Sequence, residues 1–224
     1  MKQQLELQFN EVRNRIQQAA KRAGGQAVKL VGVTKTVPVE RIEEAMALGL
    51  MCFGESRVQE AMPKLELFPQ AEWHFIGRLQ TNKVKNVVGK FSLIHSLDRW
   101  KLALALQREA EKLETTVRAL VQVNIGREKQ KGGLDPLEVE DFLSEAGKLS
   151  RLKIEGLMAV PPYSTDPEDA RPYFREMYQL FTKIRVPGVQ MKILSLGMSN
   201  DFEIAIEEGA NLVRVGSLLF GKRS

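Results

Sequence analysis

Apolar positions near the start of the chain recur at helical spacing. Residues 2–22 place apolar side chains at intervals of three and four, at Leu5, Phe9, Val12, Ile16 and Ala19–Ala20. This spacing forms one apolar stripe along an amphipathic helix. The Ala-Gly-Gly sequence at 23–25 is typical of a helix end. We therefore expect an N-terminal helix over residues 1–24.

After this helix, short apolar runs rich in β-branched residues alternate with segments of helical periodicity. The runs predict eight strands, at 28–35, 51–55, 72–77, 91–96, 116–124, 152–160, 190–197 and 211–216. The segments between them predict helices at 39–48, 57–67, 80–88, 98–113, 135–148, 167–184 and 199–208. Because strands that alternate with helices pair in parallel, eight such units predict a closed (β/α)8 TIM barrel. A doubly wound open sheet needs the same alternation and is the alternative fold.

No linker and no shift in composition divides the chain, whose 224 residues are 43% hydrophobic. That length and composition suffice for one filled core. We therefore expect a single domain over 1–224, with the extra helix at 1–24 and the barrel at 28–221. The longest loop-like piece, AVPPYSTDPEDARP at 159–172, is predicted to connect the sixth strand to its helix.

Composition narrows the class of protein. The first residues are charged throughout, and no run of about 18 apolar residues occurs, so we expect neither a secretory signal nor a membrane span. The single cysteine, Cys52, excludes an internal disulfide and fits a reducing compartment, so we expect a cytoplasmic protein. The net charge is +5, but basic residues are scattered among 28 acidic ones, so we expect no nucleic-acid binding.

In a barrel of this kind, ligand chemistry gathers at the C-terminal ends of the strands. Here these ends are polar and marked by glycines: Thr34–Lys35, Gly54–Glu55–Ser56, His74 to Arg78, His95–Ser96, Asn124, Met158 to Pro162, Ser195 to Ser199, and Arg214 to Ser217. The predicted mouth of the barrel therefore contains a lysine, Lys35, beside seven other polar strand ends.

The ends of strands seven and eight predict a phosphate site. They share small and hydroxyl-bearing residues: Ser195, Gly197, Ser199, Gly216 and Ser217. Glycine lets backbone N–H groups approach an oxyanion, serine adds a donor, and barrel phosphate sites commonly lie at these two ends. A capping box of Asn200 and Glu203 at the start of the following helix would explain the first end without any ligand.

Arg214 is predicted to face the barrel interior. It shares a strand face with Gly216, whereas Val213 and Val215 point the other way. An arginine in an apolar interior is costly without a partner, and a ligand atom would supply one.

Three other chemically capable residues are interpreted as structural. His74 and His95 are expected to be hydrogen-bonded core residues, and Cys52 a buried small hydrophobic residue. No cluster of histidine, cysteine and aspartate has metal-ligand spacing, so we expect no metal.

Lys35 ends the first strand, in VKLVGVTKTVP at 28–38. A lysine at a strand end is usually solvated, but one in a barrel mouth is partly desolvated. Desolvation and a nearby cation such as Arg214 favour the neutral amine, which can attack an aldehyde and form a Schiff base. A lysine facing a phosphate cradle fits pyridoxal 5′-phosphate (PLP), a Schiff-base aldolase, or a lysine that only pairs with phosphate. Physical reasoning leaves all three open.

Six ordered segments resemble the PLP homeostasis proteins, also called the YggS/PROSC family. They are VGVTKTVP, CFGESRVQEA, WHFIGRLQTNK, VQVNIGREKQKGG, IEGLMAVPP and LSLGMSNDFEIAIEEGANLVRVGSLLFG. The resemblance covers nearly the whole chain, from 28 to 221. It implies a barrel like the N-terminal domain of alanine racemase and PLP as the cofactor.

The resemblance also implies the PLP-binding residues. Lys35 would hold PLP as an internal aldimine, and Arg214 would face the pyridine nitrogen. Because arginine stays protonated, that nitrogen would stay unprotonated and the ring would be a weaker electron sink. The implied set is completed by Ser56, Ser195, Gly197, Met198, Ser199, Gly216 and Ser217. The family often has Asn at the position of Ser56, and the shorter side chain here could change that one contact.

We expect a PLP-binding protein without catalytic turnover. Racemase chemistry on this fold needs a second base, a tyrosine from an additional β domain, and we expect no such domain here. Of the three tyrosines only Tyr163 could approach the mouth. The resemblance implies that the protein buffers or delivers PLP and so affects amino-acid and keto-acid balance. We expect a monomer that serves apo forms of PLP-dependent enzymes.

Three alternative classes stay open. One is a PLP enzyme, such as an amino-acid racemase, with its base on a barrel loop. Another is a phosphometabolite barrel without PLP. The last is a regulatory interaction protein in which bound PLP only reports cofactor status.

Overall fold

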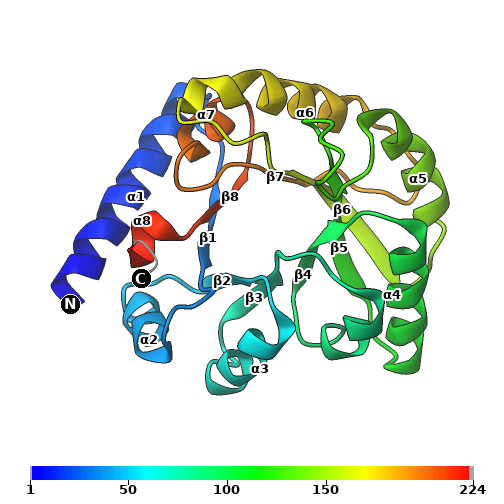
Figure 1. Ribbon diagram of the computed structural model, residues 1–224, viewed down its shortest axis with the longest axis horizontal. Helices are drawn as coiled ribbons and strands as arrows, with labels where there is room; N and C mark the ends of the chain where they lie inside the picture. The colour runs from blue at the N-terminus through cyan, green and yellow to red at the C-terminus, as the bar shows by residue number, and fades with distance from the viewer. Residues whose placement is uncertain (1, 222–224) are drawn as a thin grey trace.

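Eight parallel strands form a closed ring in the computed structural model, which describes residues 2–221 (Figure 1). The strands follow one another around the ring in chain order, and β8 pairs with β1 to close it. This confirms the (β/α)8 barrel and excludes the open sheet. Residue 1 and residues 222–224, which the predicted domain includes, lie outside the described residues.

The predicted order of strands and helices is confirmed. The strands are β1 (Lys29–Val33), β2 (Cys52–Glu55), β3 (Glu72–Phe75), β4 (Leu93–Leu97), β5 (Val117–Val123), β6 (Leu152–Ala159), β7 (Ile193–Ser195) and β8 (Leu212–Val215). The α-helices are α1 (Lys2–Arg22), α2 (Val39–Ala47), α3 (Val58–Leu67), α4 (Trp100–Lys112), α5 (Val139–Ala146), α6 (Arg171–Lys183), α7 (Phe202–Glu207) and α8 (Ser217–Phe220). Short 3-10 helices are η1 (Thr81–Asn86), η2 (Pro136–Glu138) and η3 (Pro167–Ala170).

Two elements differ from the prediction. The segment predicted as a helix at 80–88 forms the 3-10 helix η1, in which Val84 is the buried side chain. With so little apolar surface to bury, a short 3-10 turn is sufficient there. The short helix α8, which follows β8 directly, was not predicted, because four residues are too few for a periodic pattern.

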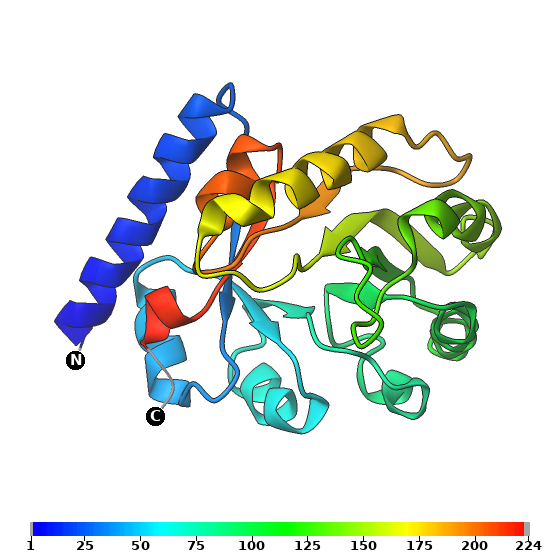
Figure 2. The same cartoon turned by 45° about the horizontal axis from the view of Figure 1, so that its top comes forward.

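The N-terminal helix α1 lies against the outside of the barrel, beside α7 and α8 (Figures 1 and 2). Its predicted apolar stripe is buried in a cluster that also contains Val213 and Val215 of β8. The outward direction of these two valines leaves Arg214 facing the interior, as predicted. Two ion pairs fix the polar edge of the helix, Arg15 to Glu203 at 2.6 Å and Arg22 to Glu207 at 2.7 Å.

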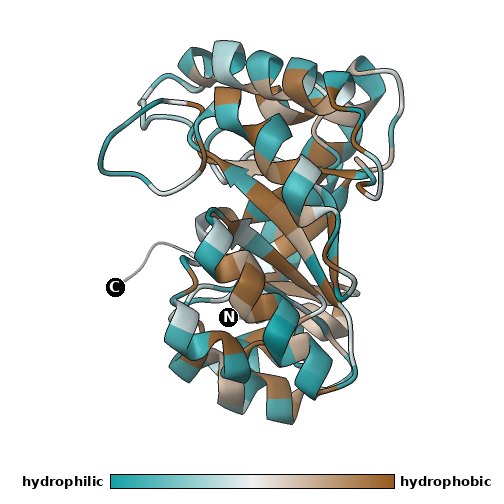
Figure 3. Cartoon of the chain, turned by 90° about the vertical axis from the view of Figure 1, so that its right-hand side faces the viewer, coloured by the Kyte–Doolittle hydropathy of each residue, from teal (hydrophilic) through white to brown (hydrophobic). Residues whose placement is uncertain are grey.

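The barrel interior is filled in layers. One layer is apolar, with Val31, Cys52, Leu93, Leu120, Met158 and Leu212. Cys52 is thus the buried small residue that the sequence predicted. The strands consist mainly of hydrophobic residues, whereas polar residues lie mainly on the outer faces of the helices (Figure 3). Among the described residues, no helix combines the length and apolar composition that a membrane crossing requires.

Replacing Gly156 with alanine is expected to destabilise the barrel by at least about 2 kcal/mol. Gly156 has φ of +152°, and a Cβ atom there would lie 1.8 Å from the carbonyl oxygen of Ile193 in the paired strand β7. Gly24→Ala is the matched control, because Gly24 also has a positive φ, +95°, but no atom lies within 4 Å of its added Cβ. Urea unfolding of both variants should show a clearly larger loss of unfolding free energy for Gly156→Ala. Equal losses of unfolding free energy in the two variants would contradict the steric explanation.

Candidate functional site at the mouth of the barrel

A cavity of about 770 Å3 lies where β1, β6, β7 and β8 end. Six of the nine predicted site residues line it: Lys35, Met198, Ser199, Arg214, Gly216 and Ser217. The other three do not form its wall. Ser195 is buried beneath Arg214, Gly197 packs on α7, and Ser56 lies at the end of β2.

Backbone N–H groups at the end of β8 are directed at a single acceptor in the cavity wall. The N–H groups of Gly216 and Leu218 donate to the Ser199 hydroxyl oxygen, at 3.3 and 3.4 Å. Both distances are longer than usual for an N–H···O hydrogen bond, which indicates weak bonds. A phosphate oxygen would be a stronger acceptor for the same donors, because it is charged. A Cβ atom on Gly216 would come within 3.3 Å of Val33, so glycine allows this close approach.

The turn before α7 is held by an aspartate rather than by the alternative capping box of Asn200 and Glu203. The Asp201 carboxylate accepts a hydrogen bond from the backbone N–H of Met198 at 2.6 Å. Glu203 is instead paired with Arg15, and Asn200 donates to the carbonyl of Ser164 at 3.4 Å. The capping box, considered as an alternative that needs no ligand, does not form, because Glu203 is paired with Arg15 of α1. Burial raises the pKa of Asp201 above its usual value.

Lys35 follows a strand end that a buried ion pair anchors. The Lys64 ammonium donates to Glu55 Oε1 at 2.6 Å and to the Thr34 carbonyl at 2.7 Å. The Thr34 hydroxyl donates to the same Glu55 oxygen at 2.7 Å, and all three residues are buried. Lys35 itself is half-buried in the cavity wall. The polypeptide that presents Lys35 is therefore fixed from beneath by charge-assisted hydrogen bonds.

Arg214 is buried beneath the cavity and satisfied by protein oxygens. Its Nη1 donates to the carbonyl and the hydroxyl oxygens of Ser195, at 2.9 and 2.5 Å, and its Nη2 donates to the carbonyl of Ala159 at 3.0 Å. Desolvation lowers the pKa of Arg214 to about 10, and the charge of Asp201 opposes that shift. At neutral pH the guanidinium therefore carries its positive charge. Sequence reasoning placed this side chain correctly but missed these protein partners.

Both histidines are buried and hydrogen bonded, as predicted. His74 Nδ1 lies 3.0 Å from His95 Nε2, and His95 Nδ1 lies 3.1 Å from the Ser195 hydroxyl. Burial lowers the pKa of His74 below the usual value and lowers that of His95 much further. Both imidazoles are therefore neutral at neutral pH.

Cys52, Glu72 and His74 bring three kinds of metal-ligating atom within 4.8 Å of one another. Sequence spacing missed the group because it forms across paired strands, with Cys52 opposite Glu72. Here the donor atoms bind one another and Lys29, whose ammonium donates to Glu72 at 2.5 Å. Burial raises the pKa of the Cys52 thiol to about 12, so it stays protonated. We interpret the group as a hydrogen-bonded cluster.

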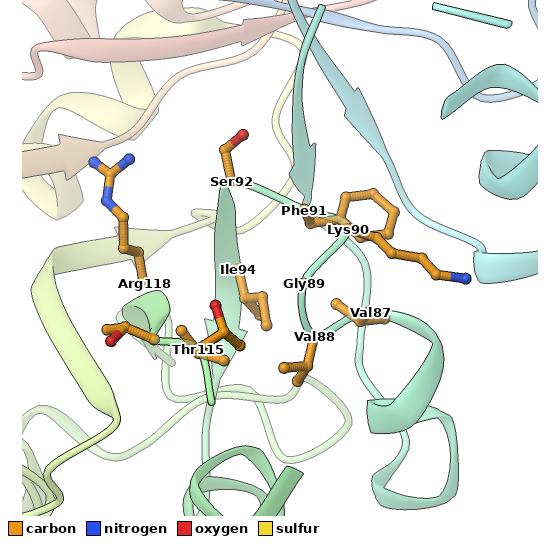
Figure 4. Close-up of a pocket in the computed structure, with 11 residues that line it drawn as sticks. Val87, Val88, Gly89, Lys90, Phe91, Ser92, Ile94, Thr115 and Arg118 are labelled. Carbon is orange, nitrogen blue, oxygen red and sulfur yellow. The ribbon is translucent and has the colours of Figure 1, made fainter. Parts of the chain in front are cut away.

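A second, smaller hollow of about 310 Å3 lies at the opposite end of the barrel, before β4 and β5 (Figure 4). Its charged wall residues already have protein partners. Arg118 is paired with Glu155 at 2.7 Å, and the Lys90 ammonium lies 3.6 Å from the Met62 sulfur. The charge of Arg118 is thus neutralised by a carboxylate, whereas Lys90 contacts a neutral sulfur and keeps its charge.

Sequence reasoning missed several residues of the mouth cavity. The loop after β1 contributes Thr36, Val37 and Pro38, and Arg41 and Lys131 add two cations. All of these except Arg41 lie within the six quoted segments, but none was assigned a role, because they come from loops and a helix start rather than from strand ends. Tyr163, considered as a residue that could approach the mouth, lines the cavity but is 87% exposed.

A family model and a curated relative together decide to which family the chain belongs. The model described as the N-terminal domain of alanine racemase matches residues 7–224. The pyridoxal phosphate homeostasis protein of Aquifex aeolicus is 48% identical over 220 residues, which cover 96% of each chain. The chain belongs to the pyridoxal phosphate homeostasis protein family. The resemblance found in the six sequence segments is thereby confirmed.

Solved structures of this family share the fold over its full length. PipY of Synechococcus elongatus is 32% identical and covers 97% of this chain and 100% of its own. Its TM-score is 0.88 without PLP and 0.83 with PLP bound. An alanine racemase of Clostridium difficile has a TM-score of 0.73 at 18% identity, so the likeness concerns the fold alone, and it covers 57% of that racemase.

Proposed function

We propose that this protein binds PLP in the mouth cavity, covalently through Lys35, and keeps it available to PLP-dependent enzymes without turning over an amino acid. The observation that carries the proposal is that Lys35, Arg214 and the N–H groups around Ser199 share one cavity. PLP contains an aldehyde, a pyridine nitrogen and a phosphate, and each of these has a chemically matched group here.

The phosphate is assigned to the ends of β7 and β8. The N–H groups of Gly216 and Leu218 already share an oxygen acceptor, and Ser199 and Ser217 add hydroxyl groups. Ser195 and Gly197 are assigned an indirect part, because Ser195 binds Arg214 and Gly197 lets the turn approach α7. Ser56 is assigned to the rim, since its side chain does not line the cavity. These assignments are supported by the placement of the donors.

PLP supplies an aldehyde, with which a lysine amine condenses to a C=N bond and one water. The chain contributes the orientation of that amine. The buried Lys64, Glu55 and Thr34 fix the residue that follows β1, so that Lys35 is presented to the cavity from the start of an anchored turn. Arg214 is charged at neutral pH and only donates hydrogen bonds, so it can bind only an unprotonated ring nitrogen. It therefore opposes the ring protonation that strengthens an electron sink.

Absence of turnover is supported by the chemistry of the cavity wall. A racemase needs a second base opposite the lysine, and Tyr163, the tyrosine of the described wall, is almost fully exposed. The alternative, a racemase-like enzyme, would need Tyr163 to become ordered over the ligand. We propose a cytoplasmic monomer whose clients are apo forms of PLP-dependent enzymes, and light scattering of the purified protein tests the monomer.

Loading and release provide the test of this function. The purified protein, saturated with PLP and freed from excess, is mixed with an apo PLP-dependent enzyme, whose activity is followed. The proposal expects recovery of that activity at a rate that depends on the loaded protein, and no racemisation or decarboxylation of amino acids by the loaded protein alone. Turnover by the loaded protein that disappears in Tyr163→Phe would favour the enzyme instead.

Replacing Ser199 with alanine is expected to weaken PLP binding about tenfold, because one hydrogen bond to a charged group contributes about 1.5 kcal/mol. Pyridoxal, which lacks the phosphate, is the matched control ligand. Its affinity should change less than about twofold, since the lost hydroxyl faces only the phosphate. Fluorescence titration with both ligands makes the comparison. Equal losses for both would place the phosphate elsewhere in the cavity.

A further inference from the structure

A continuous line of hydrogen bonds runs through the barrel from the mouth cavity toward the opposite end. It starts at Arg214, passes Ser195, His95 and His74, and ends at Glu72. The bond between His95 and Ser195 joins β4 to β7, which are not neighbours in the ring. It must therefore cross the barrel interior.

The two ends of this line are chemically fixed. Arg214 can only donate hydrogen bonds. Glu72 can only accept them, because its hydrogen bonds with His74 and Lys29 lower its pKa to about 2 and keep it ionised. Its side chain is 33% exposed, so this end of the line is in contact with solvent.

These ends permit one direction for every bond between them. His74 Nε2 lies 2.9 Å from Glu72 Oε1 and must donate to it. His74 Nδ1 then accepts from His95 Nε2, and His95 Nδ1 accepts from the Ser195 hydroxyl. The Ser195 oxygen is left to accept from Arg214. Both neutral histidines are therefore fixed as the Nε2–H tautomer.

We propose that Glu72, His74 and His95 are positioning residues for the cofactor pocket, which hold the guanidinium of Arg214 through Ser195. The proposal rests on the proposed function, in which Arg214 faces the pyridine nitrogen. A neutral Ser195 hydroxyl that donates to His95 must present its lone pairs to Arg214. The guanidinium is then held by Ser195 and by the carbonyl of Ala159, and its remaining N–H groups are left for the ring.

Protonation of His74 reverses the donor and acceptor roles along this line of hydrogen bonds. A proton on Nδ1 of His74 would oppose the N–H of His95, so His95 must change to the Nδ1–H tautomer. Ser195 would then accept from both His95 and Arg214, and the hold on the guanidinium weakens. We therefore expect the spectrum of bound PLP to change in acid together with the protonation of His74.

The charges around the two imidazoles influence the pH at which His74 becomes protonated. His74 faces Glu72, which raises its pKa, and Lys29 and Arg118, which lower it. His95 interacts electrostatically with His74, Arg214 and Lys29, and all three lower its pKa. Cys52, whose sulfur lies 3.6 Å from His74 Nε2, stays a neutral thiol.

Nuclear magnetic resonance of the apo protein tests the line without PLP. The chain contains two histidines, so long-range 1H–15N spectra show both imidazoles without overlap from others. At pH 7.5 both should be the neutral Nε2–H tautomer. An Nδ1–H tautomer or an imidazolium at either residue would overturn the proposal. A failure of the wild-type protein to bind PLP would overturn the proposed function and leave this result intact.

The coupling to the pocket is tested with Glu72→Gln, with Glu155→Gln as the matched control. Glu155 is a carboxylate of the same barrel end, paired with Arg118, but it is not part of the line. Removing the Glu72 charge disfavours the imidazolium, so the acid transitions of His74 and of the PLP absorbance should both move down by about 0.5 pH unit or more. Glu155→Gln should move them by less than half as much.

A shift of the His74 transition without a shift of the PLP absorbance would overturn the coupling. If Glu72→Gln does not fold, Ser195→Ala and Ser195→Thr provide the same test. Alanine removes the hydroxyl that links His95 to Arg214, whereas His74 still fixes the His95 tautomer, and threonine restores the link. The PLP absorbance of the alanine variant should therefore no longer follow the acid transition of His74. A PLP absorbance that still follows it would contradict the proposal.

Discussion

Lys35→Ala is expected to abolish the visible absorbance of the PLP-loaded protein and to weaken PLP binding at least about a hundredfold, which corresponds to about 2.7 kcal/mol. The variant loses the amine that forms the covalent link. It keeps the N–H groups of Gly216 and Leu218 and the charge of Arg214, so weak binding of the phosphate and ring should persist. Absorbance spectra and equilibrium dialysis measure the two effects.

Two further variants separate the amine from its charge and from its neighbours. Lys35→Arg keeps the positive charge but cannot form the link, so it should lose the absorbance as completely as alanine does. Lys131 lines the same cavity and is held by the carbonyl of Pro161. Lys131→Met should retain the absorbance. If the absorbance is lost in Lys131→Met and retained in Lys35→Ala, the covalent link is formed by Lys131 and the assignment to Lys35 is wrong.

Lys64→Met is expected to destabilise the protein by about 3–5 kcal/mol, the usual cost of leaving a buried charge without its partner. Glu55 is fully buried, its Oε1 binds Lys64 and Thr34, and its Oε2 has no hydrogen-bond partner among the described residues. Without the ammonium, the carboxylate keeps only the Thr34 hydroxyl. Urea unfolding at neutral pH measures the loss of unfolding free energy.

The double variant Glu55→Gln/Lys64→Met is the control for this effect. Removing both charges removes the desolvation penalty, so the double variant should recover at least half of the lost stability. Because Thr34 precedes Lys35 and loses its anchor, Lys64→Met should also slow the capture of PLP. A single variant as stable as the wild type would show that the pair does not hold the end of β1.

The periodic parts of the fold could be predicted from the sequence because each strand and helix buries a face that its own spacing reveals. The stripe from Leu5 to Ile16 predicted α1, and the apolar run ending at Lys35 predicted β1. The 3-10 helix η1 was predicted as a longer helix, and the short α8 was not predicted. Neither element has enough residues to form a periodic pattern.

The site was predictable where a strand end carries the chemistry. Lys35, Arg214 and Gly216 lie at or just beyond the C-terminal ends of β1 and β8 and line the cavity, so position along the predicted strands was enough to place them. The pairing of Lys64 with Glu55, and the line from Arg214 to Glu72, depend on contacts between strands and helices far apart in the sequence. Spacing within one strand contains no information on such contacts, and strand register decides them.

The covalent link to Lys35 is the central claim, and borohydride reduction tests it most directly. The PLP-loaded wild-type protein is reduced, digested and mapped by peptide mass spectrometry. The account predicts a phosphopyridoxyl group on the peptide that contains Lys35 and on no other peptide in stoichiometric amount. Modification of another lysine instead, or none at all, would contradict it and return Lys35 to an ordinary lysine at the end of a strand.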